Sequence, residues 1–184
     1  MKNLFSVKGK VAMVTGGSRG IGRMISEGLI LNGVKVFIVS RKKESCVSAA
    51  KDIENKCGGE CHPIIADLSK VEEIEYVTKQ FLSKESHLDF LINNAGASWG
   101  SSIEDFPESG WDKVLDINIK GMFFLTQKFI PILKVNASNN DPSRVINIGS
   151  IDGIINSKFE NISYSVSKAG VHHLTKILAK ELVN

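Results

Sequence analysis

The chain has 184 residues, of which 42% are hydrophobic and 23% are charged, and its formal net charge is +3. This composition is that of an ordinary globular protein and excludes an intrinsically disordered chain. The small positive charge gives no argument for a nucleic-acid partner, and no apolar run approaches the roughly 18 residues that a membrane span requires. The chain has three cysteines, an odd number without Cys-x-x-Cys spacing, and its N-terminus has no recognisable signal peptide. We therefore expect a reduced, cytoplasmic protein with no membrane partner.

Short apolar runs alternate with amphipathic stretches along the whole chain. We expect strands at 11–15, 34–39, 64–66, 88–92 and 145–148, and helices at 21–31, 43–56, 71–82, 111–133 and 164–183. Strands without polar alternation, separated by helices, predict a parallel sheet that is covered on both faces. The fold class is therefore α/β, a doubly wound, Rossmann-like sheet. The polar loop at 136–143 does not look like a domain boundary, so residues 1–184 are expected to form a single domain.

The apolar positions of two helices predict which faces they bury. For the first helix the predicted stripe is Ile21, Met24, Ile25, Gly28 and Leu29. For the last helix it is Val171, Leu174, Ile177, Leu178 and Leu182.

One cysteine-rich segment needs a choice between two interpretations. Cys57, Cys61 and His62 lie close together in the sequence and could suggest a metal site. The glycines between them favour a turn from a helix to a strand instead. We therefore expect no metal.

A glycine-rich turn follows the first predicted strand. Residues 15–22 read Thr-Gly-Gly-Ser-Arg-Gly-Ile-Gly and lead directly into a helix. Glycines permit unusual backbone dihedrals, and their missing side chains let a pyrophosphate approach the backbone at the positive end of the helix dipole. Such glycines can also serve a purely structural turn, but the order strand, turn, helix favours a nucleotide site.

The residues after the second strand predict which nucleotide is bound. An acidic residue at this place would bind a ribose 2′-hydroxyl, whereas the chain has Ser40 and Arg41, with Arg19 in the glycine-rich turn. Guanidinium groups suit a phosphate, so we predict NADP(H). The alternative is a solvated basic helix start, which is the interpretation that we prefer for Lys42 and Lys43.

Tyr164 and Lys168 lie four residues apart and therefore share one face of the last predicted helix. A phenol in water titrates near pH 10, and a neighbouring ammonium group stabilises the phenolate, so such a pair can perform acid–base chemistry. The spacing alone is a common coincidence. It gains weight here because it follows a nucleotide turn and a strand that leads into Ser150.

Five motifs in register resemble the short-chain dehydrogenase/reductase family. They are the turn at 15–22, Asp67, the run Asn-Asn-Ala-Gly at 93–96, Asn118 with Ser150, and Tyr164-x-x-x-Lys168. The resemblance covers nearly the whole chain. It is closest to the branch that reduces 3-oxoacyl thioesters, including those carried on acyl carrier protein.

The resemblance implies a role for each matched residue. Tyr164 would donate a proton to the carbonyl oxygen, Lys168 would hold the nicotinamide ribose, and Ser150 would bind the carbonyl. Asn118 would support a proton-relay water, unless it is a structural asparagine that binds backbone groups. The implied cofactor-binding residues are Thr15, Gly16, Ser18, Arg19, Gly20, Ile21, Gly22, Ser40, Arg41, Asp67, Leu68, Asn94, Ala95, Gly96, Tyr164 and Lys168.

Substrate contacts are expected after the fourth and fifth strands, because ligands of such sheets bind at the carboxyl ends of strands. The candidates are Ser98, Trp99, Ser150 and Asp152, although Trp99 could instead be a packing residue. The expected substrate is a small carbonyl compound. The resemblance suggests a 3-oxoacyl group on acyl carrier protein or coenzyme A, although other ketones fit the same chemistry.

The resemblance also indicates that the chain lacks the C-terminal strands of the family's sheet. We then expect the fifth strand, at 144–149, to form an uncovered sheet edge. Phe123, Phe124 and Phe129, together with the last helix, resemble the family's surface for homo-oligomers. Two functions remain open: an NADPH-dependent carbonyl reductase, or a truncated and inactive relative that only binds nucleotide or associates with partners.

Overall fold

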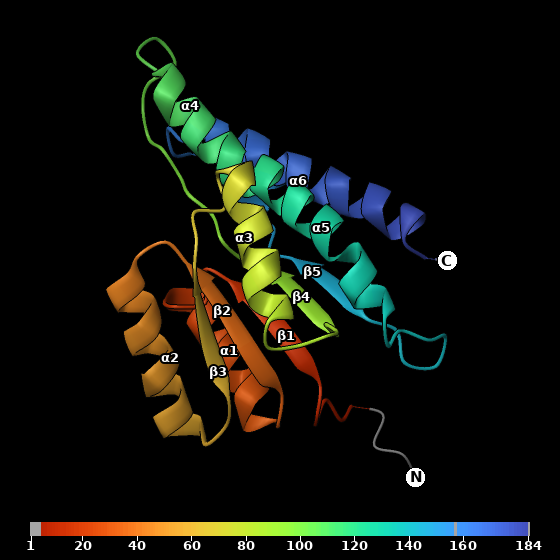
Figure 1. The fold of residues 1–184 in the computed structure, drawn as a ribbon. Coiled ribbons are helices and arrows are strands. Elements are labelled where there is room, and N and C mark those ends of the chain that lie inside the picture. The colour runs from red at the N-terminus through yellow and green to blue at the C-terminus, as the bar shows by residue number, and fades with distance from the viewer. Residues whose placement is uncertain (1–4, 157, 184) are drawn as a thin grey trace.

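A parallel five-stranded sheet forms the centre of the molecule (Figure 1). The computed structural model describes residues 5–156 and 158–183. The strands are β1 (Val11–Thr15), β2 (Lys35–Ser40), β3 (Cys61–Ile65), β4 (Phe90–Asn93) and β5 (Arg144–Asn147). Their order is β3-β2-β1-β4-β5, and every pairing is parallel. The predicted doubly wound sheet is thus confirmed, and its order reverses between β1 and β4.

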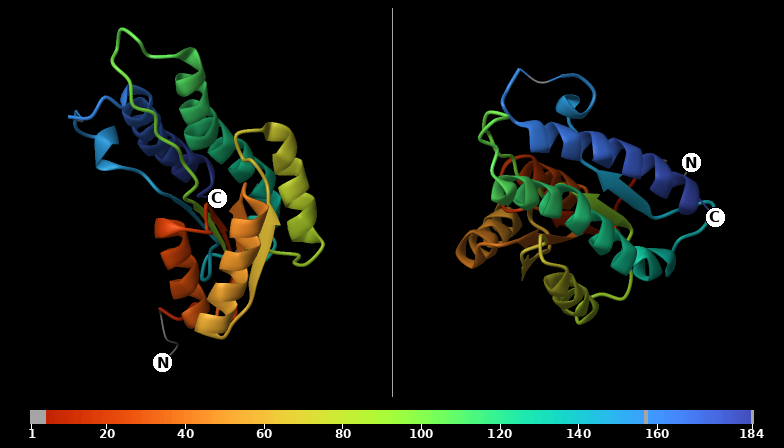
Figure 2. Two further views of the ribbon diagram at one scale, coloured as in Figure 1. Left: turned by 90° about the vertical axis from the view of Figure 1, so that its left-hand side faces the viewer. Right: turned by 90° about the horizontal axis from the view of Figure 1, so that it is seen from above.

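Helices cover both faces of the sheet (Figure 2). On one face, α1 (Gly20–Leu31) and α2 (Lys43–Cys57) pack on the side chains of alternate strand residues such as Val14 and Ile38. On the other face, α3 (Val71–Leu82) and α5 (Met122–Lys134) pack on the intervening residues, such as Met13 and Phe37. Because successive strand residues point to opposite faces, each apolar strand contributes to both cores.

The predicted buried face of α1 is correct only in part, since Ile25 and Leu29 are partly buried and pack against the core, whereas Ile21 and Met24 do not. Ile21 and Met24 are 61% and 71% exposed, whereas Gly22, Ser26 and Ile30 are buried. These three residues recur every four positions, so they line one side of the helix. Gly22 and Ser26 are small and let the first half of α1 approach the sheet closely, and this requirement outweighs the apolar pattern at Ile21 and Met24.

The helix predicted at 111–133 is interrupted. It consists of α4 (Glu108–Leu115), a π-helical turn η1 (Asp116–Gly121) and α5. A side chain at Gly121 would collide with the Leu68 carbonyl oxygen and the Asp116 carbonyl oxygen. The wider π turn and the missing side chain therefore let the helix pass close to the loop after β3.

The sequence suggested that Phe129 belongs to a surface for homo-oligomers, and this prediction was wrong. It is fully buried and makes an edge-to-face contact with Phe81 of α3, with ring centroids 5.4 Å apart. Phe123 and Phe124 are only partly buried. Phe129 therefore belongs to the hydrophobic core, and only Phe123 and Phe124 of this group are partly accessible at the surface.

The last helix, α6 (Ile162–Glu181), also differs from the prediction. Of its predicted stripe only Val171 is buried, and Ile177 is 46% exposed. Leu178 and Leu182 instead line a groove of about 520 Å³ between α5, β5 and α6. Within the described residues β5 pairs only with β4, and Ile146 is 45% exposed, so the fifth strand is a sheet edge as expected.

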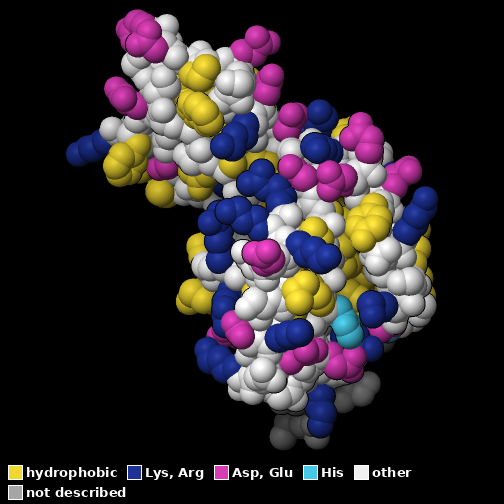
Figure 3. Space-filling model, turned by 60° about the vertical axis from the view of Figure 1, so that its left-hand side comes forward, with side chains coloured by type: hydrophobic (Ala, Val, Ile, Leu, Met, Phe, Trp, Pro, Cys, Tyr) yellow, Lys and Arg dark blue, Asp and Glu magenta, His cyan; other side chains and the backbone are white. Residues whose placement is uncertain are grey.

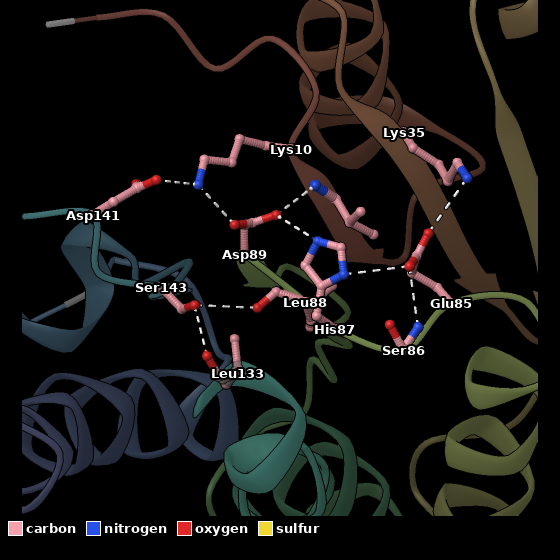
Figure 4. A network of polar contacts seen from close by, with 11 residues as sticks. Lys10, Lys35, Glu85, Ser86, His87, Leu88, Asp89, Leu133, Asp141 and Ser143 are labelled. Carbon is pink, nitrogen blue, oxygen red and sulfur yellow. Dashed lines mark hydrogen bonds and ion pairs between the residues drawn. The ribbon is translucent and has the colours of Figure 1, made fainter. Parts of the chain in front are cut away.

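A polar network joins the amino ends of the strands, on the side of the sheet away from the glycine-rich turn (Figure 4). Lys10 binds both Asp89 and Asp141, at 2.9 Å and 2.6 Å, and Asp89 also accepts a hydrogen bond from the Val11 amide at 2.8 Å. His87 lies 3.5 Å from the same Asp89 carboxylate. Segments that are 78 to 131 residues apart in the sequence are thus tied together.

Two smaller features complete the description. The turn predicted between the second helix and the third strand is confirmed, with Gly58 in the left-handed conformation at the end of α2. Among the described residues, no helix is both long and apolar enough to cross a membrane.

Candidate nucleotide and catalytic site

A cleft of about 360 Å³ opens at the carboxyl ends of β1, β2, β3 and β4. This is where the strand order reverses, the usual ligand position in open α/β sheets. The predicted cofactor residues that line it are Gly16, Ser18, Arg19, Gly20, Ile21, Ser40, Arg41, Asp67, Leu68, Asn94, Ala95 and Gly96. These predicted residues come from the segments that follow β1, β2, β3 and β4, which the cleft brings together.

The glycine-rich turn forms one wall of the cleft. Gly16 and Gly20 have φ angles of +66° and +53°, which favour glycine. The helix α1 starts at Gly20, and its N-cap residue, Arg19, makes no side-chain cap hydrogen bond. The first amide groups of α1 are thus available to an anion, and the first turn contains no acidic residue that would repel one. These features fit a dinucleotide pyrophosphate.

Two of the predicted cofactor-binding residues, Thr15 and Gly22, do not line the cleft but support the glycine-rich turn. Thr15 is buried, and its hydroxyl accepts hydrogen bonds from the amides of Asn94 and Ala95, each at 2.9 Å. A side chain at Gly22 would come within 2.5 Å of Asn94 Nδ2 and would also collide with the Gly16 carbonyl oxygen. Thr15 and Gly22 therefore fix the turn against the end of β4.

Charged and hydroxyl groups gather at the outer end of the cleft. Arg41 is an ion-pair partner of Asp67, at 3.8 Å, and its side chain is 60% exposed. The Ser18 and Ser40 hydroxyls are 2.9 Å apart. On the face shown in Figure 3, several Lys and Arg side chains gather where the overhanging part of the molecule joins the rest. This end of the cleft is suited to a phosphate group.

Sequence reasoning missed several residues of the cleft. Val39 and Ala66, at the ends of β2 and β3, give it an apolar floor, and Lys113 and Ile117 enter it from α4 and η1. Val39 and Ala66 could have been found from their position beside Ser40 and Asp67. Nothing local distinguishes Lys113 and Ile117, since only the course of the helix brings them to the cleft.

Asn118 connects the cleft to the last helix. It is fully buried in η1, and its side chain accepts a hydrogen bond from the Ala97 amide at 2.8 Å and donates to the Ala97 carbonyl at 3.0 Å. The same amide group donates to the Ser167 hydroxyl at 2.8 Å, and Ser167 donates to the Tyr164 carbonyl at 2.7 Å. Asn118 thus holds the cleft segment Gly96–Ala97 against the helix turn that carries Tyr164.

Tyr164 and Lys168 lie on one side of α6, as their spacing predicts. Lys168 is 5% exposed, and its Nζ lies 5.7 Å from the centroid of the Tyr164 ring. The ammonium group donates to the Ile148 carbonyl, at 2.6 Å, at the end of β5. Burial lowers the pKa of Lys168 below its usual value of 10.5, because the charged form loses hydration.

Ser150 follows β5 and lies at the start of η2 (Ile151–Gly153). A side chain at Gly153 would lie 2.6 Å from the main-chain carbon of Lys168, so η2 packs directly on α6. Asp152, a predicted substrate residue, accepts a hydrogen bond from Asn161 at 3.0 Å and closes the loop between them. The structure therefore gathers Ser150, Tyr164 and Lys168 at the junction of β5, η2 and α6.

Trp99 is packed against α4. A side chain at Gly110 would lie 2.8 Å from the Trp99 ring, and Lys113 Nζ lies 5.0 Å from its centroid. These contacts agree with the packing alternative. Ser98, by contrast, is exposed beside it.

A sequence profile described as short chain dehydrogenase matches residues 10–184. The chain belongs to the short-chain dehydrogenase family. A relative from Pseudomonas aeruginosa, named rhamnolipids biosynthesis 3-oxoacyl-[acyl-carrier-protein] reductase, is 43% identical over 183 residues, covering 100% of this chain and 71% of that protein. A 3-oxoacyl-[acyl-carrier-protein] reductase from Aquifex aeolicus is 33% identical over 96% of this chain and 69% of its own length.

Two solved structures have the same fold as this chain. The NADP active-site complex of Pseudomonas aeruginosa RhlG superposes with a TM-score of 0.94 at 43% identity, over 100% of this chain and 71% of that one. The complex of L-sorbose reductase from Gluconobacter frateurii with NADPH and L-sorbose gives 0.90 at 25% identity, over 97% and 66%. Both neighbours are longer than this short-chain dehydrogenase.

Proposed function

We propose that this protein uses NADPH to reduce the ketone of a 3-oxoacyl thioester to a hydroxyl, with Tyr164 as the proton donor. The observation that carries the proposal is the Asn118 clamp. Asn118 hydrogen-bonds Ala97, which lines the cleft, and also Ser167, which lies in the helix turn between Tyr164 and Lys168. A bound nucleotide and the Tyr164–Lys168 pair would then address one substrate.

The cleft residues support NADP(H) as the cofactor. The uncapped start of α1 suits the pyrophosphate, and Val39 with Ala66 gives an apolar surface for the adenine. Arg19 and Arg41 would bind a 2′-phosphate, which they can hold bidentately. When bound, the nicotinamide supplies the hydride. Two solved family members are complexes with NADP or NADPH.

The residues at the end of the cleft would complete the reaction. Tyr164 would give its hydroxyl proton to the carbonyl oxygen as the carbonyl carbon accepts the hydride, which leaves a neutral alcohol and oxidised cofactor. Ser150 would donate a hydrogen bond to the same oxygen. Lys168 would bind the nicotinamide ribose and place a positive charge beside the Tyr164 ring. Asn118 uses its side chain for the clamp, so we assign it a positioning role.

The substrate class rests on the named relatives. Two of them are called 3-oxoacyl-[acyl-carrier-protein] reductases, and a thioester of acyl carrier protein or coenzyme A presents the same ketone. Ser98 and Asp152 lie on the two loops that flank the proposed carbonyl position. Phe123 and Phe124 remain the part of the predicted oligomer surface that is not buried in the core, and we retain a homo-oligomer as part of the proposal.

The proposal is tested with Tyr164→Phe. The change removes the proton donor and keeps the ring, so we expect kcat for a 3-oxoacyl thioester to fall by roughly 10² to 10⁴-fold. The dissociation constants for NADPH should change little, because the cleft is intact. The absorbance change on NADPH oxidation measures kcat, and a fluorescence titration with NADPH measures the dissociation constant.

The other tyrosine of the chain provides a matched control. Tyr76 is 47% exposed on α3, and Tyr76→Phe should leave both quantities unchanged. Turnover that survives Tyr164→Phe would refute the acid–base assignment. Tight NADPH binding without reduction of any 3-oxoacyl thioester by the unmodified chain would instead favour the nucleotide-binding alternative over the proposal.

A further inference from the structure

A row of polar side chains runs along one face of α6. Tyr164, Lys168, His172 and Thr175 are spaced four, four and three residues apart, so they share one side of the helix. This side meets the end of β5, next to which α6 lies in Figure 1. Tyr164 and Lys168 belong to the proposed site, and the other two residues extend the row along the strand.

Two hydrogen bonds attach this face of α6 to the end of β5, one before and one after His172. Asn147, the last residue of β5, donates from its side chain to the Thr175 hydroxyl at 2.9 Å. Lys168 Nζ donates to the Ile148 carbonyl at 2.6 Å. His172 therefore belongs to a helix segment that is held on the strand at both ends.

The His172 ring occupies the place where a side chain of residue 149 would lie. A side chain at Gly149 would collide with His172 Nε2 and would lie 2.8 Å from its Cδ2. The φ angle of Gly149 is not in the positive region, so its backbone conformation does not require glycine. The space that the histidine fills therefore explains the glycine at this position.

Gly149 separates two groups of the proposed site. On one side of it, the Ile148 carbonyl accepts the hydrogen bond from Lys168. On the other side, Ser150 would bind the substrate carbonyl. The Ser150 hydroxyl accepts a hydrogen bond from the Asp152 amide at 3.3 Å, which leaves its proton available to the substrate. A shift of the main chain at Gly149 would therefore move Ser150 relative to Lys168.

We propose that His172 is a positioning residue for the reduction. Its ring packs against residue 149 and sets the place of Ser150, at the end of the strand, relative to Tyr164 and Lys168 on the helix. Gly149 and His172 act as one unit, because a larger residue 149 or a smaller residue 172 displaces the main chain before Ser150. This inference rests on the proposed function and adds to it a residue that does not touch the substrate.

A double-mutant cycle tests this unit. Gly149→Ala places a methyl group against the His172 ring, and we expect kcat for a 3-oxoacyl thioester to fall roughly 10- to 100-fold, because small displacements of reacting groups are costly. His172→Ala alone should lower kcat roughly fivefold. The two changes together remove the collision, so kcat should return to the level of His172→Ala. The dissociation constant for NADPH should stay constant, since neither residue lines the cleft.

Two further variants of α6 act as controls. His173→Ala removes the neighbouring histidine, which is exposed, and should leave kcat unchanged. His172→Phe keeps a ring at the position and should retain most of the wild-type kcat. This second result is expected because the proposed role needs a group that fills space beside Gly149.

A measurement without turnover separates this inference from the proposed function. The chain has two tyrosines, Tyr164 in the site and Tyr76 on α3, so NMR of a sample with isotope-labelled tyrosine rings follows both. Gly149→Ala and His172→Ala should each move the Tyr164 signal, and the double variant should give the signal of His172→Ala. The Tyr76 signal should stay in place. Absence of reduction by the unmodified chain would reject the proposed function, while the Tyr164 signal would still decide on His172.

Three results would overturn the role of His172. The first is an equal loss of kcat for Gly149→Ala with and without His172→Ala. The second is a His172→Ala variant with the kcat and the Tyr164 signal of the wild type, which decides the question even if Gly149→Ala does not fold. The third is a lower free energy of unfolding with unchanged kcat of the folded protein, which would mean that the contact only stabilises the fold.

Discussion

Lys168 carries a positive charge in a buried place. Within the described part of the chain no carboxylate lies at ion-pair distance from it, and its Nζ donates to the Ile148 carbonyl. An ammonium group without a counter-charge is costly to bury, and burial accordingly lowers the pKa of Lys168. The proposed function would account for a cation at this position, because Lys168 would bind the nicotinamide ribose and place a positive charge beside the Tyr164 ring.

This lowered pKa predicts a pH dependence of stability. The folded state releases the Lys168 proton at a lower pH than the unfolded state, whose value is near 10.5. Between the two pKa values the unfolded state binds more protons, so the free energy of unfolding should rise with pH in this window. Lys168→Met lacks this titration. We therefore expect the difference in free energy of unfolding, wild type minus Lys168→Met, to increase as the pH rises toward 10.5.

Urea denaturation at several pH values below 10.5 measures this difference. The pKa of the buried thiols of Cys46 and Cys61 is raised to about 11 and about 12, and their effect on stability cancels because both proteins contain them. Lys176→Met, at an exposed position of the same helix, is the matched control and should follow the wild type. A constant difference for Lys168→Met over the pH range would contradict the burial of a charged Lys168.

At the scale of elements, α1 shows how function changes the packing of a helix. Its sequence has apolar residues at Ile21 and Met24, yet these are exposed and the side with Gly22 and Ser26 is buried. The reason is that the first turn of α1 must reach the nucleotide cleft with its amide groups. This requires the helix to approach Gly16 and Asn94 closely, which only a glycine at position 22 permits.

Two glycines of α1 test this explanation. A side chain at Gly22 would collide with Gly16 and Asn94, so Gly22→Ala should lower the free energy of unfolding by about 1–3 kcal/mol and weaken NADPH binding. No atom lies within 4 Å of a side chain at Gly28. Gly28→Ala should therefore raise the free energy of unfolding by about 0.5–1 kcal/mol, because alanine favours the helix. Chemical denaturation and NADPH titration of both variants measure the effects, and similar results for the two would refute the close-approach explanation.

The helices and strands differ in how well the sequence predicted them. Alternating apolar runs and amphipathic stretches predicted the five strands and their alternation with helices, because buried parallel strands have a distinctive composition. The third strand was predicted at 64–66 but begins earlier, at Cys61, where the sequence is less apolar. The π turn around Asn118 was not predicted, since it arises from a contact with the Leu68 carbonyl, which is distant in sequence. Neither was the position of Phe129, since its apolar neighbours left the buried side of α5 ambiguous.

At the scale of the whole molecule, the two ends of the parallel strands differ in what they carry. The carboxyl ends of the strands form the nucleotide cleft, and the amino ends carry the network of Lys10, Asp89 and Asp141 (Figure 4). Asp89 is central to this network, with a side chain only 6% exposed. It binds Lys10 and the Val11 amide, and His87 lies beside it.

This arrangement predicts unequal effects for two carboxylates that share Lys10. Asp89→Asn keeps the shape but removes a buried charge with several partners, and should lower the free energy of unfolding by about 3 kcal/mol. Asp141→Asn changes a side chain that is 60% exposed, and should cost less than about 1 kcal/mol. Neither site touches the cleft, so the dissociation constant for NADPH of both variants, measured where they are folded, should equal that of the wild type. If urea denaturation gave equal decreases in the free energy of unfolding for both variants, burial would not determine how much these ion pairs stabilise the protein.

Local sequence patterns were enough to predict the class of sheet, the glycine-rich turn at 15–22 and the shared helix face of Tyr164 and Lys168. These depend on local patterns: uninterrupted apolar strands, glycines before a helix, and a spacing of one helical turn. The tertiary structure alone decided that Lys113 and Ile117 enter the cleft, that Asn118 binds the segment of Ala97 to α6, and that the His172 ring fills the space beside Gly149. Those features depend on contacts between residues that are far apart in the chain, and a local pattern contains no information about them.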